Sequence, residues 1–301
     1  MTNTEIYFSI PSDILPDISL ANSVTIDLPY VHFRRTPTEY ILYVVIDGVM
    51  YLTEDTTDYT LGPGDFIFLD PARCHYGREG SRCLYYYIHF SVPGITEMHC
   101  QPEEYFQTLS RQRLQIAAFS DRAAPGETPL LLPKYFHLPE HSRSKLQYQS
   151  KNLLLSYHQP IEYNRQTACC MLLSLFITMN QLLTDHALEE NKQEINALSL
   201  ELIAYLKIYY PEKITSERIE SHFYKNFDYI NRQFKKAIGK TIFQWLNAYR
   251  ISEAKKLLQS NLYTLKQVAD RTGFSNEFYF SRVFKKLTGN TPSEYQRQYR
   301  H

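Results

Sequence analysis

The sequence has no hydrophobic run long enough to cross a membrane. Its longest nearly unbroken apolar stretch, residues 168–179, spans about 12 residues and is interrupted by Ser174 and Thr178, whereas a transmembrane helix needs roughly 20. Residues 1–20 contain no Lys or Arg and no continuous apolar core, so they lack the pattern of a secretory signal. We therefore expect a protein without a membrane span or an export signal.

Cysteine is scarce and odd in number, with 5 residues in a chain of 301. An exported domain usually pairs its cysteines, so this number without an export signal favours reduced thiols and a cytoplasmic location. The chain is 44% hydrophobic and 14% aromatic, which is enough for packed cores. Its length predicts two or three domains.

Net charge is also absent, but the two signs are unevenly distributed along the chain. Residues 196–301 hold 18 basic and 9 acidic side chains, a net charge of +9, whereas residues 1–195 hold 14 and 23, a net charge of −9. A basic segment joined to an acidic one is typical of a nucleic-acid-binding module attached to another domain.

The basic segment contains an internal repeat at an offset of 50 residues. Residues 226–245 and 276–295 are identical at eight of twenty aligned positions. Two copies are too few for a solenoid, so they predict two similar helical units. The identical pairs are Asn226/Asn276, Tyr229/Tyr279, Arg232/Arg282, Phe234/Phe284, Lys235/Lys285, Lys236/Lys286, Gly239/Gly289 and Thr241/Thr291.

Local signals predict a helix-turn-helix in each copy. In the second copy, a short amphipathic helix ends at Gly273, and Ser275 or Asn276 caps the next helix, which stops at Gly289. A capping box at 291–294 begins a last helix, expected to run to about residue 300.

The first copy has a helix at 216–221, a turn at 222–225 and a second helix to residue 238. A helix of roughly 19 residues, expected over 242–260 between the two copies, spans about 28 Å. That length approaches the roughly 34 Å of one DNA turn, so both second helices can enter successive major-groove segments.

Residues 198–300 resemble the paired helix-turn-helix domain of the AraC/XylS family of bacterial transcription regulators. The first unit departs from the family pattern at Glu220, where a small residue is usual, and at Phe223-Tyr224, which replaces a glycine turn. The resemblance implies that promoter DNA and RNA polymerase are partners. It is carried by Arg250-Ile251, Ala254, Leu257-Leu258, Val268-Ala269, Gly273-Phe274-Ser275, the segment from Tyr279 to Lys286, Gly289, Thr291-Pro292 and Tyr295.

Base contacts are expected from the outer N-terminal half of each second helix, and phosphate contacts from flanking lysines. Asn and Arg can bond adenine and guanine edges, Glu can accept from cytosine, and Phe can pack on a thymine methyl group. The predicted base-contacting residues are Asp228, Asn231, Arg232, Glu277, Phe278, Ser281 and Arg282, and the predicted phosphate contacts are Lys235, Lys236, Lys285 and Lys286.

The acidic segment begins with short strands. Residues 40–46 are expected to form a hairpin with 49–52 through Asp47-Gly48, and further strands are expected at 66–69 and 83–92. Such spacing predicts an antiparallel sandwich or barrel. The turn residues Gly48, Pro63-Gly64-Asp65, Pro71 and His75 are similar to those of the cupin-type sensor domain common in this family.

Catalytic and metal-binding patterns are missing from this segment. Residues 47–55 contain no histidine, whereas a metal-binding cupin needs a His-x-His pair there. His137 and His141 are separated by Pro139, which prevents a helix that would bring the two rings together. Cys74, Cys83 and Cys169-Cys170 have no zinc-like spacing and are expected in the core. We therefore expect no metal, cofactor or enzymatic activity.

A ligand pocket is the remaining role for the β domain. Tyr85, Tyr87 and His89 share one face of their strand, and Tyr86, Ile88 and Phe90 share the other. With Arg34, Tyr43 and His75, the first face forms a predicted ligand site of aromatic surfaces and polar donors, suited to a sugar or polar metabolite. The alternative is that these tyrosines only pack the barrel.

The predicted fold is α+β and multidomain, with an N-terminal antiparallel cupin-like β-barrel and a C-terminal all-α double helix-turn-helix. The predicted domains are a sensor barrel at 1–105, a helical segment at 106–184, a linker at 185–195 and a DNA-binding domain at 196–301. An apolar helix at 163–183 is expected either to form a homodimer, as in the family, or to lie in the core.

The predicted function is a ligand-responsive transcription activator of carbohydrate or metabolite genes. Two alternatives remain open, namely a cupin metalloenzyme fused to a DNA-binding tail and a regulator that answers a protein partner.

Overall fold

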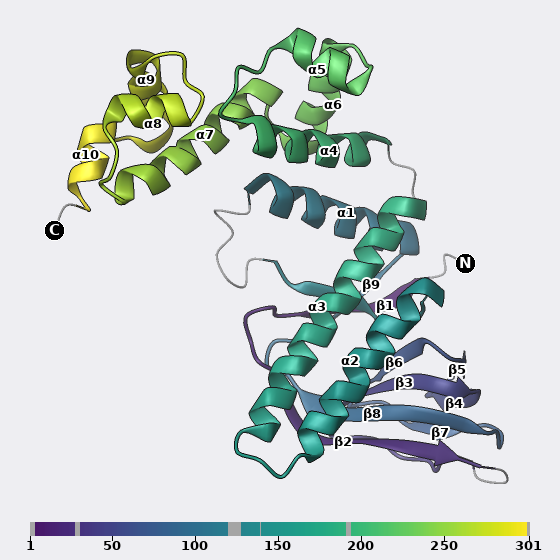
Figure 1. Cartoon of the computed structure of the whole chain (residues 1–301). Helices are drawn as coiled ribbons and strands as arrows, with labels where there is room; N and C mark the ends of the chain where they lie inside the picture. Colours follow the sequence, from purple (N-terminus) through teal and green to yellow (C-terminus); the bar gives the residue numbers. More distant parts are fainter. Residues whose placement is uncertain (1–3, 28–30, 120–127, 139, 191–193, 300–301) are drawn as a thin grey trace. The chain divides into compact units, whose positions relative to one another are not determined.

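The computed structural model describes residues 4–27, 31–119, 128–138, 140–190 and 194–299 (Figure 1). The chain forms two compact units. The first comprises Met1–Leu109 and Ala124–Ala187, and the second comprises Ser110–Ala123 and Leu188–His301. The α+β organisation, with a β-rich N-terminal domain and a helical C-terminal domain, is confirmed.

The unit boundaries differ from the expected domain limits. Helix α1 (Pro102–Phe119) contributes Leu114 and Ala118 to the hydrophobic core of the second unit, so the segment 106–184 is not one unit. Helix α3 (Asn164–Glu190) continues into the expected linker at 185–195. Residues 191–193 of that linker lie outside the described part of the chain.

The described strands of the first unit form three antiparallel sheets. The five-stranded sheet has the order β11-β6-β3-β8-β2, and the three-stranded sheets have the orders β10-β1-β9 and β5-β4-β7. Their bounds are β1 Glu5–Ile10, β2 Asp17–Ile26, β3 Tyr40–Gly48, β4 Met50–Glu54, β5 Thr57–Leu61, β6 Asp65–Leu69, β7 His75–Gly77, β8 Cys83–Ser91, β9 Thr96–Cys100, β10 Leu130–Pro133 and β11 Tyr135–His137.

The expected hairpin at Asp47-Gly48 is wrong. β3 pairs with β6 and β8, whereas β4 pairs with β5 and β7. Gly48 has a φ of +77°, and a Cβ there would lie 2.1 Å from the carbonyl oxygen of Arg82. The Asp-Gly pair therefore makes a corner at which the chain passes from one sheet to another, and a local turn signal does not distinguish these two outcomes.

The two faces of β8 are divided as predicted. Ile88 and Phe90 are fully buried in the core, where the Phe90 ring lies 5.2 Å from that of Phe176 on α3. Tyr85, Tyr87 and His89 lie on the opposite face and line a cavity. Helix α2 (Glu140–His158) runs beside α3 over the β domain (Figure 1).

Contrary to the expectation from the longest unbroken apolar stretch, helix α3 is long and apolar enough to span a membrane by length and composition alone, with a mean hydropathy of 1.5 over Asn164–Leu188. Half of that segment is buried in the structure. Its buried hydrophobic side chains pack in the core of the first unit, and the described ones are Ala168, Cys169, Leu172, Leu175, Phe176, Met179, Leu183 and Ala187.

The second unit contains two helix-turn-helix pairs joined by α7. Gly273 and Gly289 have positive φ, Asn276 caps α9, and Thr291 forms the predicted capping box with Glu294. The last helix is shorter than expected and ends at Arg297. The helices are α4 Glu194–Tyr209, α5 Ser216–Phe223, α6 Phe227–Ile238, α7 Ile242–Gln259, α8 Leu265–Arg271, α9 Glu277–Thr288 and α10 Pro292–Arg297.

Helix α7 buries a different face in each half. Ile242, Trp245 and Leu246 belong to the core of the first helix-turn-helix, whereas Ile251 and Leu258 belong to the core of the second. Its 18 residues span about 27 Å. The two helical pairs therefore have separate cores at opposite ends of one helix.

Candidate functional site: nucleic-acid interface and ligand cavity

The first helix-turn-helix has a complete turn despite its unusual sequence. Tyr224 takes the left-handed conformation that glycine usually provides, with φ 52° and ψ 34°. The Glu220 carboxylate accepts hydrogen bonds from the backbone N–H of Phe227 at 2.6 Å and from Asn226 Nδ2 at 3.1 Å. Glu220 therefore anchors the beginning of α6, where a helix has unpaired N–H groups.

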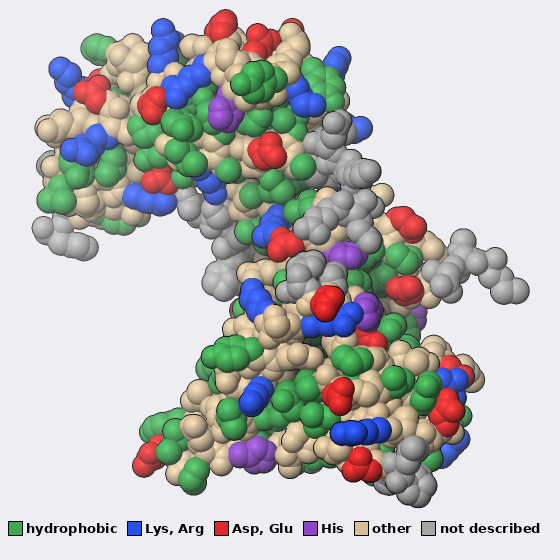
Figure 2. Space-filling view, turned by 45° about the vertical axis from the view of Figure 1, so that its right-hand side comes forward, with side chains coloured by type: hydrophobic (Ala, Val, Ile, Leu, Met, Phe, Trp, Pro, Cys, Tyr) green, Lys and Arg blue, Asp and Glu red, His purple; other side chains and the backbone are tan. Residues whose placement is uncertain are grey.

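Each second helix exposes a basic stripe opposite its buried side. On α9, Phe280 and Phe284 are buried, whereas Phe278 is 89% exposed and Arg282 is exposed. On α6, Asp228 and Arg232 are exposed in the equivalent positions. Lys235, Lys236, Lys285 and Lys286 continue these stripes and are exposed. Figure 2 shows Lys and Arg side chains spread over the second unit among hydrophobic ones.

The side-chain oxygen of Asn231 does not face outward, which differs from the predicted base contact. Its Oδ1 accepts from the backbone N–H of Ile242 at 3.0 Å, so it satisfies the first turn of α7. The equivalent residue in the second copy, Ser281, faces no such demand because Pro292 stands in place of Ile242 and has no N–H. The repeat therefore differs at this position for a structural reason.

Tyr279 supports Arg282, a role that the sequence analysis missed. The Arg282 guanidinium lies 5.4 Å from the centre of the Tyr279 ring. Asn247 on α7 donates to the Tyr279 hydroxyl at 3.5 Å. The available signal was that a tyrosine lies three residues before the arginine in both repeat copies.

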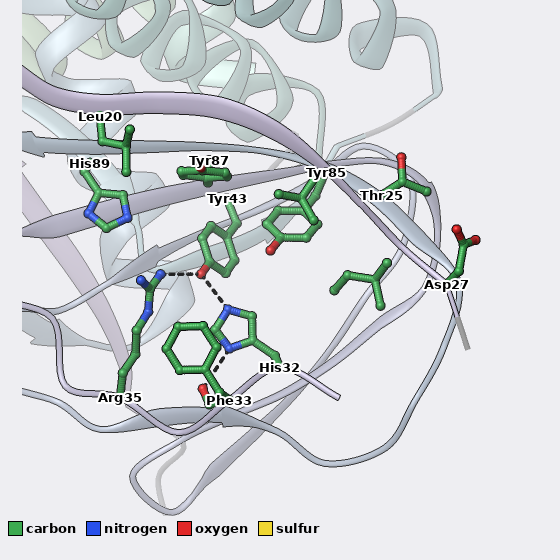
Figure 3. Close-up of a pocket in the computed structure, with 12 residues that line it drawn as sticks. Leu20, Thr25, Asp27, His32, Phe33, Arg35, Tyr43, Tyr85, Tyr87 and His89 are labelled. Carbon is green, nitrogen blue, oxygen red and sulfur yellow. Dashed lines mark hydrogen bonds between the residues drawn. The ribbon is translucent and has the colours of Figure 1, made fainter. Parts of the chain in front are cut away.

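The first unit contains a cavity of about 490 Å³ (Figure 3). Four of the six predicted ligand-site residues line it: Tyr43, Tyr85, Tyr87 and His89. His32 and Arg35 also line it and were not predicted. They come from the segment before β3, where the sequence has no regular strand pattern to show which side chains face inward.

The prediction of Arg34 is wrong by one residue. Arg34 lies with its guanidinium 4.0 Å from the centre of the Tyr76 ring and does not line the cavity. Arg35 pairs through its backbone with His75, with an N···O distance of 2.9 Å, and its side chain points into the cavity (Figure 3). Adjacent residues of an extended segment point to opposite sides, so only one of the two arginines faces the cavity.

A directed chain of hydrogen bonds crosses the cavity wall. Arg35 Nη2 donates to the Tyr43 hydroxyl at 3.0 Å, and that hydroxyl lies 3.0 Å from His32 Nε2. His32 Nδ1 lies 3.0 Å from the carbonyl oxygen of Phe33. A carbonyl can only accept, so we assign the proton to Nδ1, and Tyr43 then donates to Nε2.

His75 lies behind this chain and does not line the cavity. It is fully buried, and Arg35 Nε donates to its Nε2 at 3.1 Å. Burial, with nearby His32 and Arg35, lowers the pKa of His75 to about 3. Burial also lowers the pKa of His32 and of His89. His75 therefore stays neutral and holds Arg35 in place.

Within the described residues, no group of three or more His, Cys, Asp or Glu is placed to hold a metal ion. His137 lies in β11 beside Asp65, and Arg143 Nη2 lies 2.9 Å from its Nε2. Pro139 and the side chain of His141 lie outside the described residues. Cys83 and Cys169 are buried as expected, whereas Cys74 is half-buried and Cys170 is exposed, so two of these four thiols are not in the core.

Comparison with known proteins gives matches to both units. Residues 27–119 match the model of the AraC-like ligand binding domain, and residues 221–298 match that of a helix-turn-helix domain. An uncharacterized HTH-type transcriptional regulator of Bacillus subtilis, YisR, is 27% identical over 271 residues, 88% of each chain. The chain belongs to the AraC/XylS family. It is a DNA-binding transcription regulator with a ligand-binding domain.

Two further relatives of this AraC/XylS regulator have names that state a function. The HTH-type transcriptional activator RhaS of Escherichia coli O1:K1 is 25% identical over 62% of this chain and 65% of its own. The arabinose operon regulatory protein of Escherichia coli K12 is 39% identical over 22% of this chain and 23% of its own. The solved structure of apo ToxT from Vibrio cholerae covers 93% of this chain and 97% of its own at 16% identity, with a TM-score of 0.33.

Proposed function

We propose that this regulator inserts α6 and α9 into successive major-groove segments of promoter DNA. The observation that carries the proposal is the equivalent placement of Arg232 and Arg282, each exposed on a recognition helix at either end of α7. Arginine can bond a guanine edge through two donors. Asp228, Glu277, Phe278 and Ser281 are further candidate base contacts, and Lys235, Lys236, Lys285 and Lys286 bind phosphates.

We further propose that a small polar effector, such as a sugar, binds in the cavity of the first unit. Tyr85 and Tyr87 offer ring surfaces, while Arg35 and His89 offer polar groups, a combination typical of small-molecule sites. The names of RhaS and the arabinose regulator support an activator of carbohydrate genes. The effector acts by binding more tightly to one of two states of the protein.

The remaining parts of the proposal concern partners and location. The regulator acts in the cytoplasm as a homodimer, contacts RNA polymerase at the promoter, and has no enzymatic activity. The absence of histidine from residues 47–55 argues against a metal-dependent cupin enzyme.

Salt-dependent binding by the full chain tests the DNA-binding part of the proposal. The chain is first used to select duplexes from a random pool, and binding is then measured against salt concentration. We expect log K to fall with a slope of about 0.9 per phosphate contacted. Binding that is insensitive to salt would contradict the phosphate contacts.

A calorimetric screen of sugars against the full chain tests the effector part, and a response only to a protein partner would contradict it.

A further inference from the structure

A second hollow lies between α7 and α9 in the DNA-binding unit. Its volume is about 620 Å³. Lys240, Gln244 and Asn247 line one wall, and Arg282, Lys286 and Leu287 line the other. Of these residues, only Arg282 and Lys286 are among the DNA contacts proposed above.

The hollow adjoins the exposed stripe of the recognition helix. The N-terminal half of α7 buries Ile242, Trp245 and Leu246 in the first helix-turn-helix. Gln244, Asn247 and Ala248 lie on other sides of that half-helix and line the hollow. On α9, its wall begins at Arg282 and Lys286, which are exposed. The hollow therefore lies between the two helix-turn-helix pairs, beside the proposed DNA contacts.

The chemistry of the walls fits a sugar–phosphate chain. Lys240, Arg282 and Lys286 are cationic, and no carboxylate is among the described residues that line the hollow. Ala248, Val283 and Leu287 provide apolar surface that suits the carbon atoms of deoxyribose.

The side-chain amides that line the hollow can supply hydrogen-bond donors. Gln244 Oε1 already accepts from the backbone N–H of Thr241 at 3.0 Å, so its Nε2 amide is the group it can offer a phosphate. Asn247 Nδ2 is shared with the Tyr279 hydroxyl, at 3.5 Å. Amide donors and cations together are the groups that proteins use to hold DNA phosphates.

We propose that this hollow binds the sugar–phosphate backbone that lies between the two major-groove segments. The inference rests on the proposed function, because it requires both recognition helices on one duplex. Between two successive major-groove segments, the duplex turns its minor groove and flanking phosphates toward the protein. The hollow lies between the two helix-turn-helix pairs and would therefore contact that part of the DNA.

The test pairs protein variants with a chemically altered duplex. The full chain and a duplex it has selected from a random pool are used, and the central phosphates are replaced by neutral methylphosphonates. We expect the unaltered chain to bind the neutral duplex several-fold more weakly than the charged one. For Lys240→Ala the loss of affinity should be much smaller, since the effects of removing the two partners of one contact are not additive. Lys240→Ala should also make the slope of log K against log salt concentration shallower by about 0.9.

Two further variants complete the test. Ala248→Glu places a carboxylate in the hollow and should weaken binding to every duplex. Lys255→Ala is the control, because it removes a cation that lies on the same helix but outside the hollow, near Tyr295. Lys255→Ala should leave the response to central methylphosphonates unchanged. Melting temperatures of all variants are compared, so that a folding defect is recognised.

Three outcomes separate the possibilities. This inference would be overturned if the unaltered chain and Lys240→Ala lost equal affinity on the neutral duplex while Ala248→Glu bound DNA normally. If Arg232→Ala and Arg282→Ala still lose affinity in that case, the proposed function stands. Variants that bind DNA normally but lose transcription by purified RNA polymerase would overturn the inference and assign the hollow to a protein partner.

Discussion

Arg250 on α7 donates from its Nε to the carbonyl oxygen of Tyr210 at 2.8 Å. Its Nη2 donates to the carbonyl oxygen of Glu212, also at 2.8 Å. The side chain is buried, and burial lowers its pKa. Gly273 lies against the same groups, because a Cβ there would be 2.4 Å from the Tyr210 oxygen. Arg250 therefore links the loop before α5 to the turn of the second helix-turn-helix, so the two pairs are joined by more than α7.

Gly273→Ala should destabilise the second unit more than Gly289→Ala. Both glycines have positive φ, but a Cβ at Gly289 meets nothing within 4 Å. We expect Gly289→Ala to cost about 1 kcal/mol through backbone strain alone, and Gly273→Ala to cost roughly 1–3 kcal/mol more through overlap with the Tyr210 carbonyl. Trp245, the single tryptophan, is buried in the core of the first helix-turn-helix and not beside these glycines, so circular dichroism in urea is the measurement for both variants. Equal losses would show that the contact with Tyr210 relaxes easily.

Glu220→Ala should destabilise α6, whereas Glu220→Gln should be close to neutral. The glutamine retains an oxygen that can accept from the backbone N–H of Phe227, and alanine does not. Loss of a helix-capping acceptor costs about 1 kcal/mol. Urea unfolding followed by Trp245 fluorescence gives the difference. A glutamine variant as unstable as the alanine variant would indicate that the negative charge, and not the acceptor, stabilises the turn.

Arg232→Ala and Arg282→Ala should each lose roughly 1–3 kcal/mol of binding free energy on a selected duplex and relax the preference at one base pair. Lys286→Ala should weaken binding to all sequences about equally. Glu220 and Tyr224 complete the first turn, but Tyr279 supports Arg282 specifically, so we expect Arg282 to matter at least as much as Arg232. Titrations on duplexes with single base-pair changes measure each effect. A clearly larger loss for Arg232→Ala would contradict this ranking.

Arg35→Ala should abolish effector binding, and Arg34→Ala should not. The two residues are neighbours with the same charge, but only Arg35 lines the cavity and bonds Tyr43. Tyr87→Phe should weaken binding through loss of one hydroxyl. Calorimetry with an effector found by the sugar screen measures all three variants. Undiminished affinity in both Arg35→Ala and Tyr87→Phe would place the effector site elsewhere.

The first unit should lose stability as the pH falls below about 6. The pKa of His75 is about 3 in the folded protein, against an ordinary value of 6.5, so the unfolded chain binds a proton that the folded chain does not. The stability is present above pH 6.5 and is lost as the pH falls toward 3, by about 1.4 kcal/mol per pH unit for each such histidine. Urea unfolding followed by circular dichroism from pH 7 to 4 measures the slope. His75→Gln should make it shallower, and an unchanged slope would mean that other groups cause it.

The sequence by itself determined the parts of the protein whose signals are local. Gly273, Asn276 and the Thr291–Glu294 capping box act within a few residues of their own backbone, so the second helix-turn-helix and its exposed stripe could be predicted. The alternation of side chains along β8 is equally local, and it placed Tyr85, Tyr87 and His89 on one face.

Tertiary structure decided what depends on a distant partner. Asp47-Gly48 became a corner because β4 pairs with β5 and β7 and not with β3. Arg35, not Arg34, faces the cavity because its backbone pairs with His75, forty residues later. Asn231 turned from the expected DNA contact to the start of α7 because the N–H of Ile242 lies within its reach. In each case a polar group or strand edge took a partner that lay beyond the reach of any local pattern, because leaving it unpaired in a folded chain costs free energy.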